Sequence, residues 1–291
     1  MVRFFLFLMT AFLLSAPSVW AAPKTVLKIA LGDPEGSEMG IVGEMFKKYV
    51  AEKSNGEIEV QTFYSGSLGD ETETIHNVRR GTLALSCVGI ANTVPFVKQL
   101  GILNLPYLFE NLDEVVKATN GKSAEILNTY AEKAGFRVLA WTYTGFRYIS
   151  NSKRPITKMA DIKGLKIRVP QSTVLLATYK AWDASPVFIP WSETFVALQD
   201  GVVDGQCYGY IGFRAMKFQK ARQKYITEVH HVYQLQPLIM SERVFQKMTP
   251  EQRQLMIDAG KAAQEAVLAY QKEESADRKS TRLNSSHTNR S

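Results

Sequence analysis

The sequence predicts an α/β protein with mostly parallel strands, and three observations support this class. Apolar runs typical of buried strands alternate with segments whose apolar residues recur at the helical period. Helix-capping serine, aspartate and glycine residues stand at the boundaries of those segments. The chain of 291 residues is 45% hydrophobic and 22% charged, which is typical of a globular protein and excludes a coiled coil, a collagen or a disordered chain.

The first half of the chain supplies alternating strands and helices. The predicted strands are residues 27–31, 57–64, 83–90 and 137–143. The predicted helices are one that ends near Gly56, one that starts at Asp70 and ends at Gly81, and one from Ser123 to about Lys133. The glycines at positions 32, 36 and 40 lack the spacing of a phosphate-binding loop, so we assign that loop no nucleotide.

The second half repeats the pattern. The predicted strands are residues 148–150, 165–169 and 186–190. We expect Ser172 to cap one helix and Ser192 to cap another, over residues 193–200. The longest predicted helix runs from Pro250 to about Glu274, and its apolar face comprises Leu255, Met256, Ala259, Ala263, Val267 and Tyr270.

The N-terminus has the three parts of a secretory signal peptide. Arg3 provides the cationic start, residues 4–14 are apolar, and small residues flank Trp20. We therefore predict a signal peptide over residues 1–21, cleaved after Ala21, and a mature protein exported to the periplasm. The apolar stretch is shorter than the roughly 20 residues that span a bilayer, and no later stretch approaches that length.

The charge distribution argues against a nucleic-acid partner. The formal net charge is +7, but Arg3 and three basic residues of the last segment, residues 279–291, account for much of it. That segment has no acidic residue, one aliphatic residue and no periodicity, and it resembles translated adaptor sequence. We interpret residues 279–291 as a non-native tail on a mildly basic body.

Cysteines and histidines give no sign of a metal or cofactor. Cys87 and Cys207 could form a disulfide in an oxidising compartment, but their sequence surroundings favour two unpaired thiols. His230 and His231 are adjacent in a strand-like segment, so we expect their side chains on opposite faces. The sequence presents no nucleophile, base or metal set with supporting context, which argues against an enzyme.

Five segments together carry a family resemblance. They are FYSGSLGD at residues 63–70, LNLPYLF at 103–109, GFR at 145–147, DIKGLKIRVP at 161–170, and ASPVFIPWSETFVALQDGVVDG at 184–205. In this order they resemble the solute-binding proteins of tripartite ATP-independent periplasmic (TRAP) transporters, the DctP-like family. The resemblance covers residues 26–275, nearly the whole mature chain.

The resemblance implies a two-lobed periplasmic-binding-protein fold with mixed sheets flanked by helices, a ligand cleft between the lobes and a long C-terminal helix. We assign residues 22–145 and 234–273 to lobe 1 and residues 146–233 to lobe 2. We expect lobe 2 to be incomplete, because the tail occupies the place of further family elements, and the long helix to be partly uncovered.

The resemblance also implies function. A monomeric receptor would capture an organic carboxylate and deliver it to the integral-membrane subunits of a TRAP transporter, without any cofactor. Two alternatives stay open: a receptor for a sensor or an ATP-driven importer, and an exported enzyme on the same scaffold.

In the family, the arginine of the RVP motif, here Arg168, forms the main ion pair with the ligand carboxylate, and Arg147 commonly assists. Arginine suits this role because its planar fork binds a carboxylate through two parallel hydrogen bonds. From the residues alone, Arg168 would face a cleft if its neighbours face a core. A surface or salt-bridged strand arginine is the alternative for Arg168, and a solvated basic face with Lys153 and Arg154 is the alternative for Arg147.

Three aromatic residues complete the predicted site. Tyr208 stands where many family members have a ligand-contacting asparagine, so the ligand can differ from the sugar acids and small diacids of those members. Trp191 and Phe146 are candidates for the cleft lining, with packing in the core as the alternative, and the alternative for Tyr208 is simple packing between the lobes.

Overall fold

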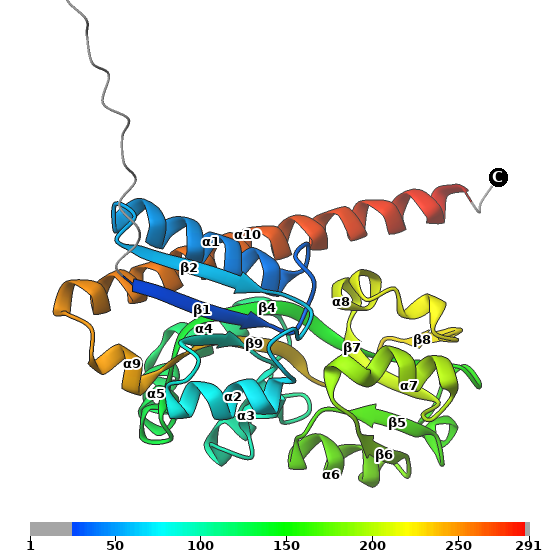
Figure 1. The fold of residues 1–291 in the computed structure, drawn as a ribbon. Coiled ribbons are helices and arrows are strands. Elements are labelled where there is room, and N and C mark those ends of the chain that lie inside the picture. The colour runs from blue at the N-terminus through cyan, green and yellow to red at the C-terminus, as the bar shows by residue number, and fades with distance from the viewer. Residues whose placement is uncertain (1–24, 289–291) are drawn as a thin grey trace, which may run out of the picture.

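The computed structural model describes the backbone of residues 25–288 and the side chains of residues 25–274. The predicted signal peptide and residues 289–291 of the predicted tail lie outside the described residues. The strands form a nine-stranded mixed sheet in the order β2-β1-β3-β9-β4-β7-β5-β6, and β8 pairs with β4 outside that path. Figure 1 shows helices on both sides of these strands.

The strands are β1 (Thr25–Leu31), β2 (Ile58–Phe63), β3 (Leu85–Cys87), β4 (Phe136–Asn151), β5 (Lys166–Val169), β6 (Ser185–Phe188), β7 (Gly205–Gly209), β8 (Tyr225–Thr227) and β9 (Tyr233–Ser241). The α-helices are α1 (Glu38–Lys53), α2 (Glu71–Arg80), α3 (Ile90–Thr93), α4 (Leu112–Asn120), α5 (Lys122–Lys133), α6 (Thr173–Ala181), α7 (Thr194–Asp200), α8 (Tyr210–Ala215), α9 (Glu242–Gln246) and α10 (Pro250–Thr288). The short 3₁₀ helices are η1 (Lys98–Asn104), η2 (Met159–Ile162), η3 (Trp191–Glu193) and η4 (Phe218–Lys220).

The fold has two lobes, as the resemblance implied. In the first lobe β1 pairs in parallel with β2 and β3, and β9 runs antiparallel to β3. Its apolar core joins β1, β2 and β3 to β9 and α10. The second lobe contains β5 to β8, with two smaller apolar clusters around α6 and α7. Figure 1 shows the lobes side by side. The residue boundaries assigned to each lobe stay a prediction.

Strand β4 links the two lobes and differs from the prediction. It pairs with β9 between Phe136 and Phe146, and with β7 from Arg147 to Asn151. The sequence predicted two strands separated near Gly145, which is wrong. Gly145 has φ +85° and lies in an irregularity of the β4–β9 pairing, so the backbone passes through this point without ending the strand.

Other element boundaries differ from the predicted ones for local reasons. The strand predicted at 83–90 is confined to β3, because Ile90 begins α3. Gly121, rather than Ser123, stands at the N-cap of α5, and Ser192 lies inside η3 and caps no helix. His230 has φ +51° and precedes β9, so the two histidines do not share a strand. Antiparallel pairs at β9 and β4 make the sheet more mixed than the element pattern predicted.

The long C-terminal helix is confirmed, and it continues to Thr288, beyond the predicted end near Glu274. Met256, Ala259, Ala263 and Val267 are buried on its predicted apolar face. Figure 1 shows α10 beside α1, with its far end extending past α8. An ion pair of 3.8 Å between Arg214 of α8 and Glu274 connects this helix to the second lobe.

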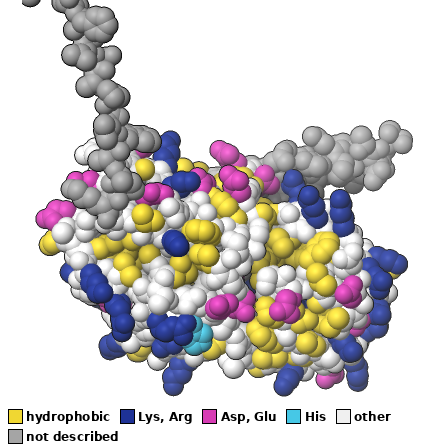
Figure 2. All heavy atoms as spheres, viewed as in Figure 1, with side chains coloured by type: hydrophobic (Ala, Val, Ile, Leu, Met, Phe, Trp, Pro, Cys, Tyr) yellow, Lys and Arg dark blue, Asp and Glu magenta, His cyan; other side chains and the backbone are white. Residues whose placement is uncertain are grey.

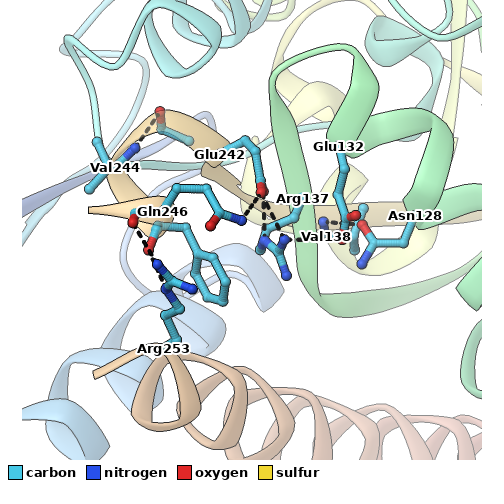
Figure 3. Close-up of polar contacts among 10 residues, drawn as sticks. Asn128, Glu132, Arg137, Val138, Glu242, Val244, Gln246 and Arg253 are labelled. Carbon is cyan, nitrogen blue, oxygen red and sulfur yellow. Dashed lines mark hydrogen bonds and ion pairs between the residues drawn. The ribbon is translucent and has the colours of Figure 1, made fainter. Parts of the chain in front are cut away.

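An arginine fixes the start of β4 to α9 (Figure 3). Arg137 donates from Nε and Nη2 to the two oxygens of Glu242 at 2.7 and 3.0 Å, and Glu132 lies 3.2 Å from Nη2. The guanidinium also stacks 3.8 Å from the ring centre of Phe245. Partial burial alone would raise the pKa of Glu242. The hydrogen bonds from Arg137 and Gln246 and the charges of Arg137 and Arg253 outweigh this effect and hold the pKa below its usual value.

The surface shows no concentration of one charge on the face seen in Figure 2, where Lys and Arg side chains spread around the edge with acidic side chains among them. Cys87 and Cys207 are buried free thiols, in agreement with the sequence interpretation. Among the described helices we find none that combines the length and apolar character needed to cross a bilayer.

Candidate ligand-binding site

A small cavity of about 10 Å³ lies where the two lobes meet. Lobe 1 contributes Glu71 at the start of α2 and Asn92 of α3, and lobe 2 contributes residues from β4, β5, η3 and β7. Strand β9 adds Gln234 and Gln236. The carboxyl ends of strands in open α/β sheets are where ligands bind, so this position is the expected one. The volume corresponds to about one water molecule, so the side chains nearly fill the site.

Arg168 lines this cavity and is 2% exposed. Its neighbours Ile167 and Val169 are buried in the lobe 2 core, and its Nε donates to the carbonyl of Ile189 at 2.8 Å. Burial lowers the pKa of the Arg168 guanidinium to about 10, which leaves it charged at neutral pH. The structure therefore places a buried cation here, and the alternative of an exposed strand arginine is wrong.

Arg147 lines the same cavity and is also 2% exposed. Its Nη1 donates to the carbonyl of Cys207 at 2.6 Å and lies 3.3 Å from the Cys207 sulfur, and its Nε has no hydrogen-bond partner in the described part of the chain. The solvated basic face considered for Arg147 is thus excluded. Two guanidinium groups converge on one buried cavity.

Trp191 and Tyr208 form a stacked pair beside the arginines. Their ring centres are 4.3 Å apart with an angle of 24° between the planes. The Arg168 guanidinium lies 5.4 Å from the Trp191 ring and that of Arg147 lies 5.7 Å from the Tyr208 ring. At these distances each guanidinium is attracted to the face of its ring by a cation–π interaction. Both aromatic residues line the cavity, as the sequence analysis expected.

Asp33 of lobe 1 accepts a hydrogen bond from each member of this aromatic pair. Its Oδ1 accepts from the Trp191 Nε1 at 2.6 Å, and its Oδ2 accepts from the Tyr208 hydroxyl at 3.3 Å. Asp33 is 1% exposed, and burial raises the pKa of its carboxyl despite these hydrogen bonds. The sequence analysis missed Asp33, whose only local signal is its position directly after the first strand.

Glu71 is the second acid of the site and was also missed. Its Oε2 accepts from the backbone N–H of Gly89 at 3.1 Å and from the amide of Asn92. Burial, and then the charge of Asp33, raise the pKa of Glu71 to about 7. The side-chain oxygen Oδ1 of Asn92 accepts from the backbone N–H of Gln171 in lobe 2 at 3.1 Å, so Glu71 belongs to a hydrogen-bond chain that crosses the cleft.

Phe146 does not join the other four predicted residues. It precedes Arg147 on β4, and its ring packs 5.1 Å from Tyr233 and 5.2 Å from His230. It is not part of the cavity lining. Because successive side chains of a strand point to opposite faces, the position that directs Arg147 into the cleft directs Phe146 away from it.

A two-lobed α/β fold with buried cations in its cleft defines a solute-binding protein. Residues 31–288 match the model of the bacterial extracellular solute-binding protein family 7. The chain belongs to this family, which confirms the resemblance given above.

Individual relatives agree with the family. A solute-binding protein of Verminephrobacter eiseniae is 34% identical over 241 residues, covering 83% of this chain and 72% of the relative. A TRAP periplasmic solute-binding protein of a Polaromonas species, solved with bound D-erythronate, is 32% identical with a TM-score of 0.84, covering 87% of this chain and 83% of that one. Another from Sulfurospirillum deleyianum, solved with bound succinate, is 28% identical with a TM-score of 0.82, covering 91% and 86%.

Proposed function

We propose that this protein captures an organic carboxylate in the periplasm and delivers it to a TRAP-type secondary transporter, without altering it chemically. The observation that carries the proposal is the convergence of Arg168 and Arg147 on one buried cavity between the lobes. Buried cations are costly unless an anion pairs with them. Arg168 and Arg147 donate to the carbonyls of Ile189 and Cys207, and a ligand carboxylate would give both a directly bonded anion.

The geometry supports a direct role for both arginines. The hydrogen bond of Arg168 uses Nε, and the hydrogen bonds of Arg147 use Nη1, so further N–H groups of both forks are available to a ligand. A bidentate contact with one carboxylate would use them at short, charge-assisted distances. Trp191 and Tyr208 would limit the movement of both guanidinium groups.

Closure of the lobes is part of the proposal. A cavity of about 10 Å³ is smaller than any organic acid, so the lobes must separate or the side chains must move before a ligand enters. The contacts of Asp33 with Trp191 and of Asn92 with Gln171 cross the cleft and would re-form around the ligand. Binding would then shift the population toward the closed form.

Location and partner follow from the family. Members are extracellular solute-binding proteins, and the solved relatives include TRAP periplasmic receptors. Our proposal therefore includes export through a signal peptide over residues 1–21. It also includes a monomeric receptor that delivers its ligand to the membrane subunits of a TRAP transporter.

A binding screen tests the proposed function. Carboxylates, sugars, amino acids and uncharged controls are added to the purified protein, and the shift in melting temperature is measured. We expect carboxylates alone to raise it. Arg168→Lys should weaken the carboxylate affinity by about 10-fold to 100-fold in calorimetry, because lysine cannot form the bidentate contact.

Arg214→Lys is the matched control, because Arg214 lies on α8 with a side chain that is 62% exposed. It should leave the affinity unchanged. Binding of uncharged solutes alone, or equal affinity in Arg168→Lys and the wild type, contradicts the proposal.

A further inference from the structure

The two sides of the cavity differ in hydrogen-bonding chemistry. Arg147 and Arg168 present donors and positive charge. Glu71, Gln234 and Gln236 line the rest of the cavity, and the amide oxygens of the two glutamines have no hydrogen-bond partner among the described residues. A ligand that fits both sides needs one group that accepts hydrogen bonds and carries negative charge, and other groups that donate.

The two glutamines give the clearest signal. Gln234 and Gln236 are two residues apart on β9, so their side chains lie on the same face of the strand. They are 2% and 1% exposed, and the amide oxygen of each has no hydrogen-bond partner among the described residues. An unpaired buried carbonyl oxygen costs about 1–3 kcal/mol, so each oxygen favours a ligand that brings a donor.

The orientation of Gln236 is set by its neighbours. Its Nε2 donates to the Tyr208 hydroxyl at 2.7 Å, which leaves Oε1 as the group without a partner. A ligand hydroxyl can donate to such an oxygen, whereas an ionised carboxylate has no hydrogen to donate. The tyrosine at position 208 led us to consider ligands other than sugar acids, but the amide of Gln236 beside Tyr208 offers amide chemistry of the kind that an asparagine would supply, so the structure favours a hydroxylated acid.

The charges of the site disfavour a second ligand carboxylate. The cavity lining holds two guanidinium groups and Glu71, and Asp33 is hydrogen-bonded to the lining residues Trp191 and Tyr208, so the four groups sum to zero charge when all are ionised. One ligand carboxylate can be balanced if Glu71 takes up a proton, which its pKa of about 7 makes accessible. A second would require protonation of Asp33, whose carboxylate accepts from Trp191 and Tyr208, or would leave a buried negative charge unpaired.

We propose that the ligand is a hydroxylated monocarboxylate of the aldonic-acid class, and that Glu71, Gln234 and Gln236 select it over dicarboxylates. This inference rests on the proposed function and names its substrate class. The solved relatives do not decide the matter, because the Polaromonas protein holds D-erythronate and the Sulfurospirillum protein holds succinate. Our choice of an aldonate rests on the unpaired amide oxygens of Gln234 and Gln236 in this chain's cavity lining.

Matched ligands test the selection. Titration calorimetry at pH 7.5 compares erythronate with meso-tartrate and galactonate with galactarate, pairs in which only the second carboxylate differs. Butyrate tests the hydroxyl groups, and erythritol tests the carboxylate. We expect at least one of the two aldonates to bind about 10-fold or more tightly than its paired diacid, and erythronate to exceed butyrate if erythronate is the aldonate bound.

Variants assign the selection to residues. Gln234→Met keeps the side-chain length and removes the acceptor, so it should weaken aldonate binding by about 5-fold to 50-fold and leave any butyrate binding unchanged. Glu71→Gln keeps nearly the same shape and removes the group that takes up a proton, so calorimetry in two buffers at pH 7.5 should show proton uptake on aldonate binding in the wild type and none in this variant. Unfolding curves of both variants confirm that they fold.

The outcomes separate the two proposals. Diacids or butyrate that bind as tightly as the aldonates overturn the aldonate inference and leave the carboxylate receptor intact. An unchanged aldonate affinity in Gln234→Met, or equal proton uptake in Glu71→Gln and the wild type, also overturns the inference. Absence of binding by every carboxylate, or erythritol binding as tightly as erythronate, overturns the proposed function itself.

Discussion

The indole N–H of Trp191 donates to Asp33 Oδ1 at 2.6 Å, a contact between residues 158 positions apart in the sequence and in different lobes. The same carboxylate accepts from Tyr208, which stacks on Trp191. One acid of lobe 1 therefore fixes the aromatic pair that lies against both arginines of lobe 2. Contacts from both lobes thus hold the aromatic pair beside the cations.

The Asp33–Trp191 contact should be measurable as a coupling energy. We expect Asp33→Ala and Trp191→Phe each to destabilise the protein, and the double variant to lose about 1–3 kcal/mol less than the sum, because each single change leaves a buried polar partner unpaired. Urea unfolding of the four proteins measures this. Additive effects within about 0.5 kcal/mol would show that the contact contributes no coupling.

Gly212 of α8 should be irreplaceable because of Tyr208. A Cβ at position 212 would overlap the Tyr208 ring. We expect Gly212→Ala to cost about 1–3 kcal/mol of stability by overpacking and to weaken carboxylate binding by displacing that ring. Gly36→Ala is the control, since a Cβ there meets no atom within 4 Å. Equal melting temperatures and affinities for the two variants would be inconsistent with this role.

Glu71 should make stability fall as the pH rises. Its pKa is about 7 in the folded protein against an ordinary value of 4.5, so the folded state binds the proton more tightly. Its favourable contribution is complete below pH 4.5 and is lost as the pH rises to about 7. Glu71→Gln cannot titrate, so its stability relative to the wild type should increase by roughly 1–3 kcal/mol over this interval. Urea unfolding at pH 4.5 and 7.5 checks this, and a constant difference would contradict it.

Arg137 should affect stability without affecting the ligand. Arg137→Lys loses the bidentate contact with Glu242 and the stacking on Phe245, so we expect a loss of about 1 kcal/mol. Because this cluster lies at the start of β4, away from the cavity lining, carboxylate affinity should stay the same. Calorimetry and urea unfolding test both parts, and a loss of affinity would show that the β4 start is coupled to the cleft.

Patterns confined to a few residues predicted much of the fold. Asp70 and Ser172 cap α2 and α6 as expected, because a cap depends on its own backbone and the next three residues. Strand β9 was not predicted, although all its residues are buried. Pro237 argues against a central strand, yet it pairs with Trp141 of β4 within the sheet.

The sequence by itself determined the α/β class and the long apolar helix face, because both follow from spacing within one segment, and the family resemblance of two short motifs named Arg168 and Arg147 as candidates. Only the tertiary structure decided that Asp33, Glu71, Gln234 and Gln236 join those arginines. Their side chains carry no local pattern, and they meet because separate strands and helices end at the same cleft. The tertiary structure also showed that Phe146 packs against Tyr233 and does not line the cavity. It showed that the two predicted strands form one strand, β4, which the sequence could not reveal because the partner strand β9 lies far away in the chain.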